Sequence, residues 1–385
     1  MLIMLVIGVR PQVIKAAPLI KLLYRDPEVN FMLIHSGQHY DFEMSKIFFN
    51  EFDLPNPDVN LGIGSGSHAE QTAKIILKLE PLILNTKPDV VVVFGDANTT
   101  LGSALAAIKL NVPVAHVEAG LRSWDLSMPE EINRILTDHC SQILYAPTKY
   151  AFKNLIYEGI PKDMILLSGD TMYDSILLHL GDIDKSRIVE EFDLEENNFI
   201  VVTAHRAENV DSPIRLSNMV NALLKLNSIK IVFPVHPRTR KNLIKFGLID
   251  KLKRAHHIIL TNPLGYFDML KLIKTSSLVL TDSGGIQKEA FILNTPCITM
   301  RSRTEWIETI LSGANTLVSI NEELIVKKAL QILKRSKEIK EKLASIPKPY
   351  GNGNASEIIV NDLKSRIASG TLKVGPIKAF TINNY

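Results

Sequence analysis

Two carboxylates stand directly after apolar runs in the first half of the chain. Asp96 follows residues 90–94 and one glycine, and Glu118 follows residues 114–117. Unbroken apolar runs of this length are typical of strands buried on both faces of a parallel sheet, whose carboxyl ends share one edge. Burying a carboxylate there costs hydration free energy, which is offset only if the charge binds a partner or takes part in the function. Neither acid caps an obvious helix start. Asp96 and Glu118 are therefore predicted to serve the chemistry of the protein and not its fold.

A second acidic pair follows Pro129, where the pattern predicts the start of a helix. Acids are favoured in the first turn of any helix, which explains Glu131 well and Glu130 in part. A functional role therefore stays open for Glu130.

The run Asp282-Ser283-Gly284-Gly285 follows a predicted strand in the second half and opens a helix. Glycines at such a place let an anion approach free backbone N–H groups, and Ser283 adds a hydroxyl donor. A simple serine or glycine cap is the alternative, although two glycines with a serine exceed what a cap needs. We therefore predict a phosphate cradle, with Glu289 one turn later accepting from ribose hydroxyls.

Basic side chains also follow predicted strands. They are Arg10 and Lys15 after the first strand, and His205-Arg206 and His236-Pro237-Arg238 in the second half. Cations beside a helix N-terminus suit a diphosphate, and strand-end His/Arg pairs suit anion binding or proton transfer. Solvated loops and structural histidines are the alternatives. Because the second half also holds the cradle, anion binding is favoured there.

The elements that must position these residues follow an α/β pattern. Val- and Ile-rich runs alternate with helix-length amphipathic stretches in two successive blocks, which predicts two domains with parallel sheets. The predicted strands are 2–8, 31–35, 90–94, 114–117 and 143–145, then 199–204, 229–235, 258–260, 278–280 and 297–300. Two domains also suit 385 residues, which exceed what one core usually serves. We predict domains at 1–175 and 176–353, a charged linker at 181–198, and a terminal helix and tail at 354–385.

Composition excludes several classes of protein. The chain is 46% hydrophobic and 22% charged, as in ordinary soluble proteins, and it shows no apolar run long enough to span a membrane. A net charge of +3 is too small to suggest nucleic-acid binding, and two distant cysteines predict neither disulfides nor a thiolate metal site. The run 64–69 matches a dinucleotide fingerprint, with Asp89 further on, but Pro55 and Pro57 precede it where a strand should stand.

Taken together, these motifs resemble the non-hydrolysing UDP-N-acetylglucosamine 2-epimerases from residue 1 to about 365. The matching segments are Arg10-Pro11 with Ile14-Lys15, Ser36-Gly37-Gln38-His39, Gly95-Asp96 with Thr99, residues 116–123, Pro129 to Arg134, His205-Arg206 with Glu208-Asn209, and Asp282 to Glu289. The resemblance implies a GT-B architecture, with two Rossmann-like domains facing across a cleft and the terminal helix crossing back to the first. It also implies a homodimer, and we expect a role in cell-surface polysaccharide biosynthesis. Because the opening run 1–8 is interpreted as a buried strand and not as a signal peptide, we expect the protein to be cytoplasmic.

The implied reaction inverts C2 of UDP-GlcNAc to give UDP-ManNAc by elimination and re-addition of UDP. By motif match Asp96, Glu118, Glu130 and His205 are the catalytic candidates. The residues expected to bind the UDP-sugar are Arg10, Lys15, Arg134, Arg206, His236, Arg238, Ser283, Gly284, Gly285 and Glu289. No cofactor, metal, nucleic acid or membrane is implied.

Two departures from the family pattern leave the substrate open. Family members often carry Thr-Glu-Arg-Pro-Glu where this chain has Thr304-Glu305-Trp306-Ile307-Glu308, so Arg301 or Arg303 would have to replace the missing arginine. Some family members are activated by their own substrate at a second site. Residues 38–41 lack the sequence that follows Gln-His in those members. The alternatives are therefore an epimerase of a UDP-2,3-diacetamido uronate, a GT-B glycosyltransferase, a non-catalytic UDP-sugar sensor or a hydrolysing epimerase.

Overall fold

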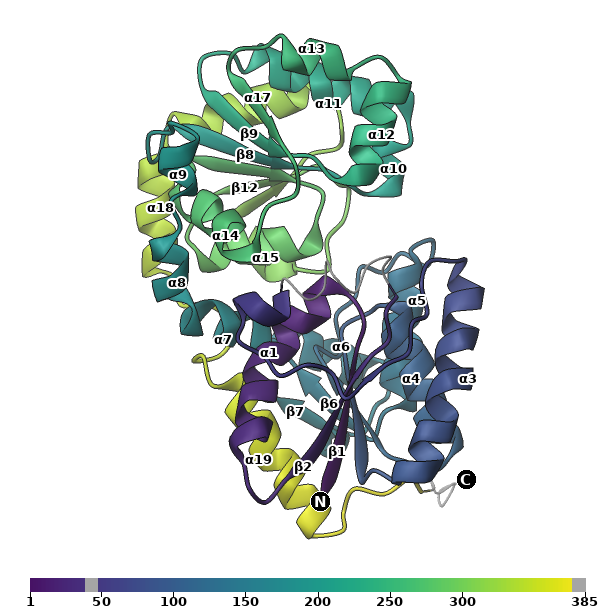
Figure 1. Ribbon diagram of the computed structural model, residues 1–385. Coiled ribbons are helices and arrows are strands. Elements are labelled where there is room, and N and C mark those ends of the chain that lie inside the picture. The colour runs from purple at the N-terminus through teal and green to yellow at the C-terminus, as the bar shows by residue number, and fades with distance from the viewer. Residues whose placement is uncertain (39–47, 376–385) are drawn as a thin grey trace, which may run out of the picture. The chain divides into compact units, whose positions relative to one another are not determined.

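The computed structural model describes residues 1–38 and 48–375. These form two compact units (Figure 1). The first comprises Met1–Leu177 and the chain from Pro349 onward, and the second comprises Leu178–Lys348. The chain thus leaves the first unit after residue 177, where 175 was expected, and re-enters it at 349, where 354 was expected.

The first unit is built on a seven-stranded parallel sheet with the order β3-β2-β1-β4-β5-β6-β7. Its strands are β1 (Leu2–Ile7), β2 (Asn30–His35), β3 (Val59–Asn60), β4 (Val90–Phe94), β5 (Val114–Val117), β6 (Ile143–Ala146) and β7 (Ile165–Leu167). Every residue of β4 and β5 is buried, because helices cover both faces of the sheet. The pairing of Phe94 with Val117 brings the residues that follow these two strands to the same edge.

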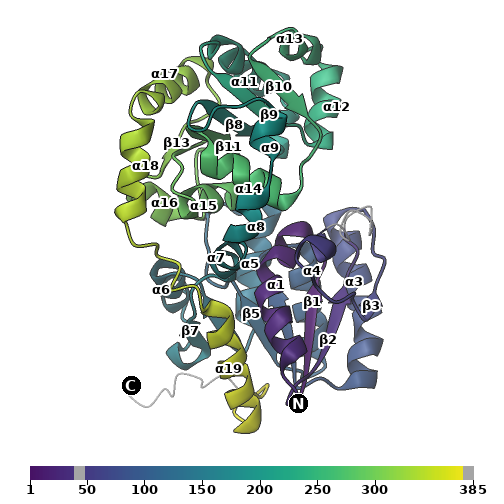
Figure 2. The ribbon, with the colours of Figure 1, turned by 60° about the vertical axis from the view of Figure 1, so that its left-hand side comes forward.

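Helices cover the two faces of this sheet (Figure 1). They are α1 (Arg10–Arg25), α3 (His68–Thr86), α4 (Asn98–Lys109), α5 (Pro129–Cys140), α6 (Lys149–Tyr157), η1 (Lys162–Met164), α7 (Thr171–Leu178) and α19 (Ala355–Ala368). Helices α3, α4 and α5 pack in a row, and α1 packs against α19 (Figure 2). Lys364 of α19 pairs with Asp26 and Glu28, and Asp362 accepts from the Tyr145 hydroxyl at 2.9 Å. The terminal helix is therefore part of the first unit.

The second unit contains a six-stranded parallel sheet with the order β10-β9-β8-β11-β12-β13. Its strands are β8 (Phe199–Thr203), β9 (Lys230–Pro234), β10 (Ile258–Thr261), β11 (Leu278–Thr281), β12 (Cys297–Thr299) and β13 (Asn315–Leu317). Its helices are α8 (Leu180–Lys185), α9 (Ile188–Glu191), α10 (Ala207–Val210), α11 (Pro213–Lys225), α12 (Pro237–Lys245), α13 (Ile249–Lys253), α14 (Tyr266–Thr275), α15 (Gly284–Ile292), α16 (Ile307–Leu311), α17 (Glu322–Leu333) and α18 (Ser336–Ser345).

The predicted linker at 181–198 is wrong. This segment contains α8 and α9, both of which pack against α14, and it buries Ile183, Ile188 and Val189. Its high charge hid three apolar residues that are enough to attach two short helices. The edge strands β3, β7 and β13 also escaped prediction, because runs of two or three residues show no readable period.

Two features are absent from the part of the chain that the structure describes. Among residues 1–38 and 48–375, no helix combines the length and apolar character needed to cross a bilayer. The same residues contain no cluster of three or more His, Cys, Asp or Glu side chains placed to hold a metal ion.

Candidate active site

The structure brings Asp96 and Glu118 to the same edge of the first sheet, as predicted. Gly95 between β4 and Asp96 has a φ of +63°, which suits glycine, whereas Glu118 adopts +71° directly after β5. A left-handed conformation at a residue with a Cβ costs about 1 kcal/mol or more and persists only where the surroundings enforce it. Such strain is concentrated at functional sites, so it supports a functional interpretation of Glu118.

Glu118 forms an ion pair with Lys15 of α1. The Lys15 Nζ lies 2.5 Å from the Glu118 Oε1, and both side chains are at least nine-tenths buried. A side chain on Gly95 would bring its Cβ to 3.1 Å from this ammonium, so the glycine leaves room for the pair. The sequence predicted Lys15 as a diphosphate ligand, and the structure adds that it compensates the charge of a catalytic candidate.

Asp96 is held by Arg134 of α5. The Arg134 Nη2 lies 2.5 Å from the Asp96 Oδ2, and its Nη1 lies 2.7 Å from the Glu131 Oε2. The Asp96 side chain keeps 31% of its surface exposed, while Arg134 is buried. The neighbouring Asn133 fixes the same loop by donating to the Asp96 carbonyl at 2.9 Å. Arg134 and Asn133 thus fix the position of Asp96, while part of its side chain stays exposed.

Glu131 has a clearer task than its helix position suggested. Its side chain is fully buried, and it accepts from the backbone N–H groups of Ser123 at 2.9 Å and Trp124 at 2.8 Å. Its place in the sequence predicts only an acid of a first helical turn. Glu130 lies beside it in that turn and is half-buried.

The loop after β1 is fixed by close packing and by Gln12. A Cβ on Gly8 would fall 1.8 Å from the Ser36 Oγ, so only glycine fits. The Gln12 side chain accepts from the Gly8 N–H at 2.8 Å and donates to the Phe94 carbonyl at 2.7 Å, which ties this loop to β4. Arg10 begins α1 with its guanidinium 4.6 Å from the centre of the Phe48 ring. Neither Gln12 nor Ser36 was singled out as part of this support from the sequence.

Gln38 joins the same edge of the sheet. Its Oε1 accepts from both the backbone N–H and the hydroxyl of Thr99, at 3.0 and 2.7 Å. The motif that follows it, His39-Tyr40-Asp41, lies outside the described residues.

In the second unit Asp282 organises the loop after β8. Its fully buried carboxylate accepts from the backbone N–H groups of His205 and Arg206 at 3.0 Å and from the Asn209 side chain at 3.1 Å. The acid that opens the predicted cradle is therefore a structural anchor, and its oxygens already accept hydrogen bonds from three N–H donors. It places His205, whose Nδ1 lies 3.5 Å away and whose side chain is 39% exposed.

The two glycines of the cradle differ in their surroundings. Ser283 is the N-cap of α15 and makes no side-chain cap bond. A Cβ on Gly284 would lie 2.0 Å from the Glu305 Oε1, whereas a Cβ on Gly285 would meet nothing closer than the Ser283 Oγ at 4.0 Å. Gly284 is thus required by packing. The open space at Gly285 leaves the helix N-terminus accessible to an anion.

The departure at Trp306 is accommodated by Lys288. The Lys288 ammonium lies 4.1 Å from the centre of the Trp306 ring, and both side chains are buried. Arg301, considered as a replacement for the missing arginine, forms a buried ion pair with Glu305 at 3.1 Å. Arg303 is exposed. Glu289, one turn along α15, is 4% exposed.

His236 and Arg238 have local partners. The His236 Nδ1 accepts from the Arg238 N–H and so caps α12, while its ring lies 5.5 Å from that of His205. The Arg238 guanidinium pairs with Asp211 at 2.5 Å, and this pair raises the pKa of Arg238. Both side chains of the pair are about half exposed, so the contact is a surface ion pair.

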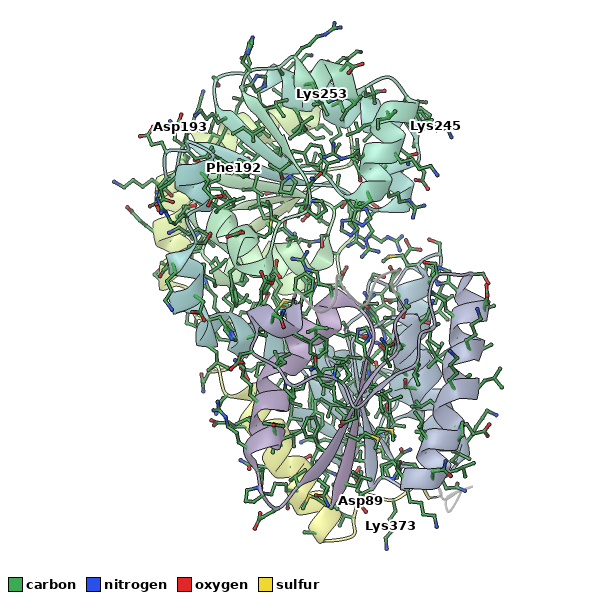
Figure 3. All side chains as sticks on the ribbon, viewed as in Figure 1. Asp89, Phe192, Asp193, Lys245, Lys253 and Lys373 are labelled. Atoms are coloured by element: carbon green, nitrogen blue, oxygen red, sulfur yellow. The ribbon has the colours of Figure 1, made fainter. Side chains whose placement is uncertain are left out.

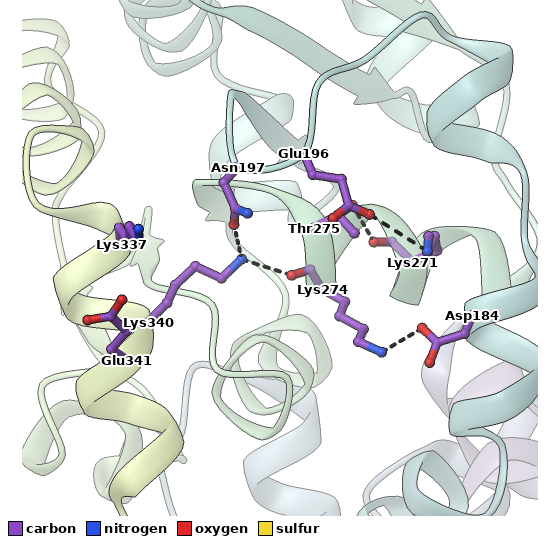
Figure 4. A pocket seen from close by; sticks show the side chains of 9 residues that line it. All are labelled: Asp184, Glu196, Asn197, Lys271, Lys274, Thr275, Lys337, Lys340 and Glu341. Atoms are coloured by element: carbon purple, nitrogen blue, oxygen red, sulfur yellow. Dashed lines mark hydrogen bonds and ion pairs between the residues drawn. The ribbon is translucent and has the colours of Figure 1, made fainter.

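A cavity of about 600 Å³ lies elsewhere in the second unit and contains none of the predicted residues (Figure 4). Lysines and acids line it, and the Lys340 Nζ donates to the Asn197 Oδ1 at 2.6 Å and to the carbonyls of Lys274 and Ser276. Burial lowers the pKa of Lys340 to about 8, but these oxygens compensate the ammonium. We therefore interpret this cavity as structural, since Lys340 connects α18 to the segments around Asn197 and Lys274.

The dinucleotide fingerprint at 64–69 has no suitable context. The strand that precedes it, β3, is only two residues long. Asp89 lies at the amino ends of the strands, close to where the chain begins (Figure 3), and accepts from the Leu2 N–H at 2.7 Å. His68 at the start of α3 bonds to Asn98 at the carboxyl ends. The acid and the glycines therefore lie at opposite edges of the sheet.

Comparison with known proteins identifies the family. The sequence model described as UDP-N-acetylglucosamine 2-epimerase matches residues 21–364. The chain belongs to the UDP-N-acetylglucosamine 2-epimerase family. It is 47% identical over 367 residues to a UDP-N-acetylglucosamine 2-epimerase homolog of Methanococcus maripaludis, covering 95% of this chain and 100% of the relative. The resemblance noted from the motifs is confirmed, and with it the isomerase class.

Two further members of the epimerase family bear on the fold and the ligand. The crystal structure of the Methanocaldococcus jannaschii UDP-GlcNAc 2-epimerase, in complex with UDP-GlcNAc and UDP, superposes with a TM-score of 0.87 at 45% identity, covering 95% of this chain and 100% of that one. The predicted GT-B-like fold class of two parallel-sheet domains is confirmed. A UDP-2,3-diacetamido-2,3-dideoxy-D-glucuronate 2-epimerase of Pseudomonas aeruginosa is 43% identical over 368 residues, covering 94% of this chain and 99% of the relative.

Proposed function

We propose that this protein is a non-hydrolysing epimerase that interconverts UDP-GlcNAc and UDP-ManNAc. The observation that carries the proposal is the pair of strand-end acids, Asp96 and Glu118, each bound by a buried cation at 2.5 Å. The epimerase of M. jannaschii, whose structure holds UDP-GlcNAc and UDP, supports it with 45% identity over nearly the whole chain.

The chemistry requires more than one acid or base. In the proposed reaction a carboxylate removes the C2 proton while the bond between C1 and the UDP oxygen breaks, which leaves a 2-acetamidoglucal and UDP. UDP then adds back to C1, and a proton returns to the opposite face of C2. Because two faces are involved, at least two groups must transfer protons, and we assign this work to Asp96, Glu118 and Glu130.

The cations beside these acids hold the carboxylates in place. Lys15 binds the Glu118 Oε1, and Arg134 binds the Asp96 Oδ2. A buried charged pair stays well ordered only while both partners are present, since removing one leaves an uncompensated charge. We therefore propose that Lys15 and Arg134 fix the orientation of Glu118 and Asp96.

The second unit is proposed to bind UDP. Ser283, Gly284 and Gly285 would offer the N-terminus of α15 to the diphosphate, because free N–H groups and the helix dipole favour an anion there. His205, held by Asp282, would stabilise the diphosphate as it leaves. Glu289 would accept from the ribose hydroxyls, with Arg10, Arg206 and His236 adding contacts to the UDP-sugar.

A second substrate is favoured by one observation. The chain carries Trp306, whose ring packs against the Lys288 ammonium, at a position where many family members carry an arginine. The P. aeruginosa relative is a UDP-2,3-diacetamido-2,3-dideoxy-D-glucuronate 2-epimerase. The extra carboxylate of such a sugar needs a cation. Arg303, exposed in the segment between β12 and α16, is the nearest candidate in the sequence.

The proposal is tested by incubating the protein with UDP-GlcNAc in D2O and following the sugar signals by NMR. Formation of UDP-ManNAc with deuterium at C2 is expected. Release of free ManNAc would indicate a hydrolysing enzyme, and binding without C2 exchange would refute the epimerase assignment for this sugar. A parallel reaction with UDP-2,3-diacetamido-2,3-dideoxy-glucuronate determines which substrate gives the higher kcat/KM.

A further inference from the structure

One buried charged cluster of the first unit has no part in the residue set described above. His116 lies on β5, Arg122 in the loop after it, Asp138 on α5 and Glu158 at the end of α6. The side chains of His116, Arg122 and Asp138 are fully buried, and Glu158 is 13% exposed. Burying this many ionisable groups is costly unless each is paired, so the cluster must serve the surrounding structure.

His116 holds the loop that carries Asp96. Its Nε2 lies 2.8 Å from the carbonyl oxygen of Gly95, and its Nδ1 lies 2.6 Å from the Asp138 Oδ1. A carbonyl only accepts hydrogen bonds, so the Nε2 must carry a proton and donate it. The ring thereby connects α5 to the peptide unit that joins Gly95 to Asp96.

Asp138 holds the loop that carries Glu118. Its Oδ2 accepts from the Gly120 N–H at 3.1 Å and pairs with the Arg122 Nη2 at 2.7 Å. Burial by itself would raise the pKa of the Asp138 carboxyl, but His116 and Arg122 together lower it, so the group stays ionised at neutral pH. Gly120, two residues after Glu118, must be glycine, because an added Cβ would lie 2.3 Å from the Ala151 carbonyl oxygen.

We propose that His116 and Asp138 are positioning residues that set the relative placement of Asp96 and Glu118. The pair holds the carbonyl immediately before Asp96 and the amide two residues after Glu118. One rigid unit therefore fixes the backbone at both acids, including the left-handed conformation of Glu118. A catalytic group displaced by about 1 Å loses about a hundredfold in rate, so this support affects turnover directly.

The inference rests on the proposed epimerase function and is tested with the whole protein. The variants His116→Phe and His116→Gln are compared with the wild type for kcat, KM and C2 deuterium exchange with UDP-GlcNAc. Phenylalanine keeps the ring but removes both polar contacts, whereas glutamine keeps one N–H for the Gly95 carbonyl. We expect His116→Phe to lower kcat at least tenfold with KM within twofold of wild type, and His116→Gln to restore part of the loss.

Tyr145→Phe is the matched control. Tyr145 is buried on the neighbouring strand β6 and donates one hydrogen bond, to Asp362 of α19 at 2.9 Å, so its loss weakens the same unit without touching either acid. Thermal unfolding and circular dichroism report the folded fraction of every variant. The control is expected to keep the wild-type kcat.

The outcomes separate the two hypotheses. A folded wild type that exchanges no C2 proton refutes the proposed function. An active wild type together with a folded His116→Phe of unchanged kcat refutes the positioning role, as does a variant that raises KM alone or loses activity only in proportion to its folded fraction. If His116→Phe does not fold, His116→Gln decides, because a lowered kcat at unchanged KM supports the role and a wild-type kcat overturns it.

Discussion

The cradle at the start of α15 gives a sharp prediction, since its two glycines should fail in different ways. In Gly284→Ala the new methyl would stand 2.0 Å from the Glu305 Oε1, a distance that no Cβ tolerates. Glu305 would have to move and so loosen its buried ion pair with Arg301. In Gly285→Ala the methyl has 4.0 Å of clearance, so the fold accepts it. It would nevertheless fill the space that we propose for the diphosphate.

The magnitudes follow from these contacts. Overpacking a buried site costs about 1–3 kcal/mol, and we expect Gly284→Ala to lose that much of its free energy of unfolding. Gly285→Ala gains a few tenths of a kcal/mol from helix propensity, while losing one charge-assisted hydrogen bond to phosphate weakens UDP binding by about 1.5–3 kcal/mol. The second figure corresponds to a Kd raised roughly 10- to 150-fold.

Calorimetric titration with UDP and urea unfolding measure the two quantities. Gly181→Ala is the control, because Gly181 lies in α8 of the same unit and its Cβ would meet nothing within 4 Å. That variant should bind UDP as the wild type does and be at least as stable. A folded Gly285→Ala with unchanged affinity for UDP would refute the cradle, and an undisturbed stability of Gly284→Ala would refute the packing argument.

Three other changes have defined outcomes. Asp96→Asn should lower kcat about 10²- to 10⁴-fold while leaving UDP affinity within twofold, as steady-state kinetics and calorimetry would measure. Lys15→Met leaves Glu118 buried without its cation, so urea unfolding should show a loss of about 3–5 kcal/mol, and a variant as stable as wild type would contradict the pairing. Burial raises the pKa of Cys297 to about 12, so its thiolate is scarce until the pH approaches that value. At pH 8 iodoacetamide should modify Cys297 only after unfolding, whereas partly buried Cys140 reacts first, as peptide mass spectrometry would detect.

Long elements were predictable because their signal is local. The apolar run Val90–Phe94 and the amphipathic stretch that became α11 are recognisable from residue type and period alone. The charged segment 181–198 misled for the opposite reason, since α8 and α9 depend on a few apolar contacts with α14 that no local pattern reveals.

The candidate site likewise contains residues that the sequence predicted and partners that only the structure shows. Residue types at strand ends pointed to Asp96, Glu118 and the glycines of the cradle. The partners of those residues come from elsewhere in the chain, as Lys15 does for Glu118 over 103 positions, and separation of that kind leaves no mark in a single sequence. The sequence likewise predicts Asp282 as part of a phosphate site, whereas in the structure it accepts from backbone N–H groups of the loop after β8.

The amino-acid sequence by itself determined the α/β class, the family and the list of acids and glycines available for chemistry, because these depend on residue type and on short spacings. Only the tertiary structure decided which charge compensates which acid, why Gly284 and Gly285 are not equivalent, and that His116 and Asp138 connect the loops that carry Asp96 and Glu118. Those properties depend on distances between residues brought together by folding. A buried charge is stabilised by whatever lies within a few ångströms, not by its neighbours along the chain.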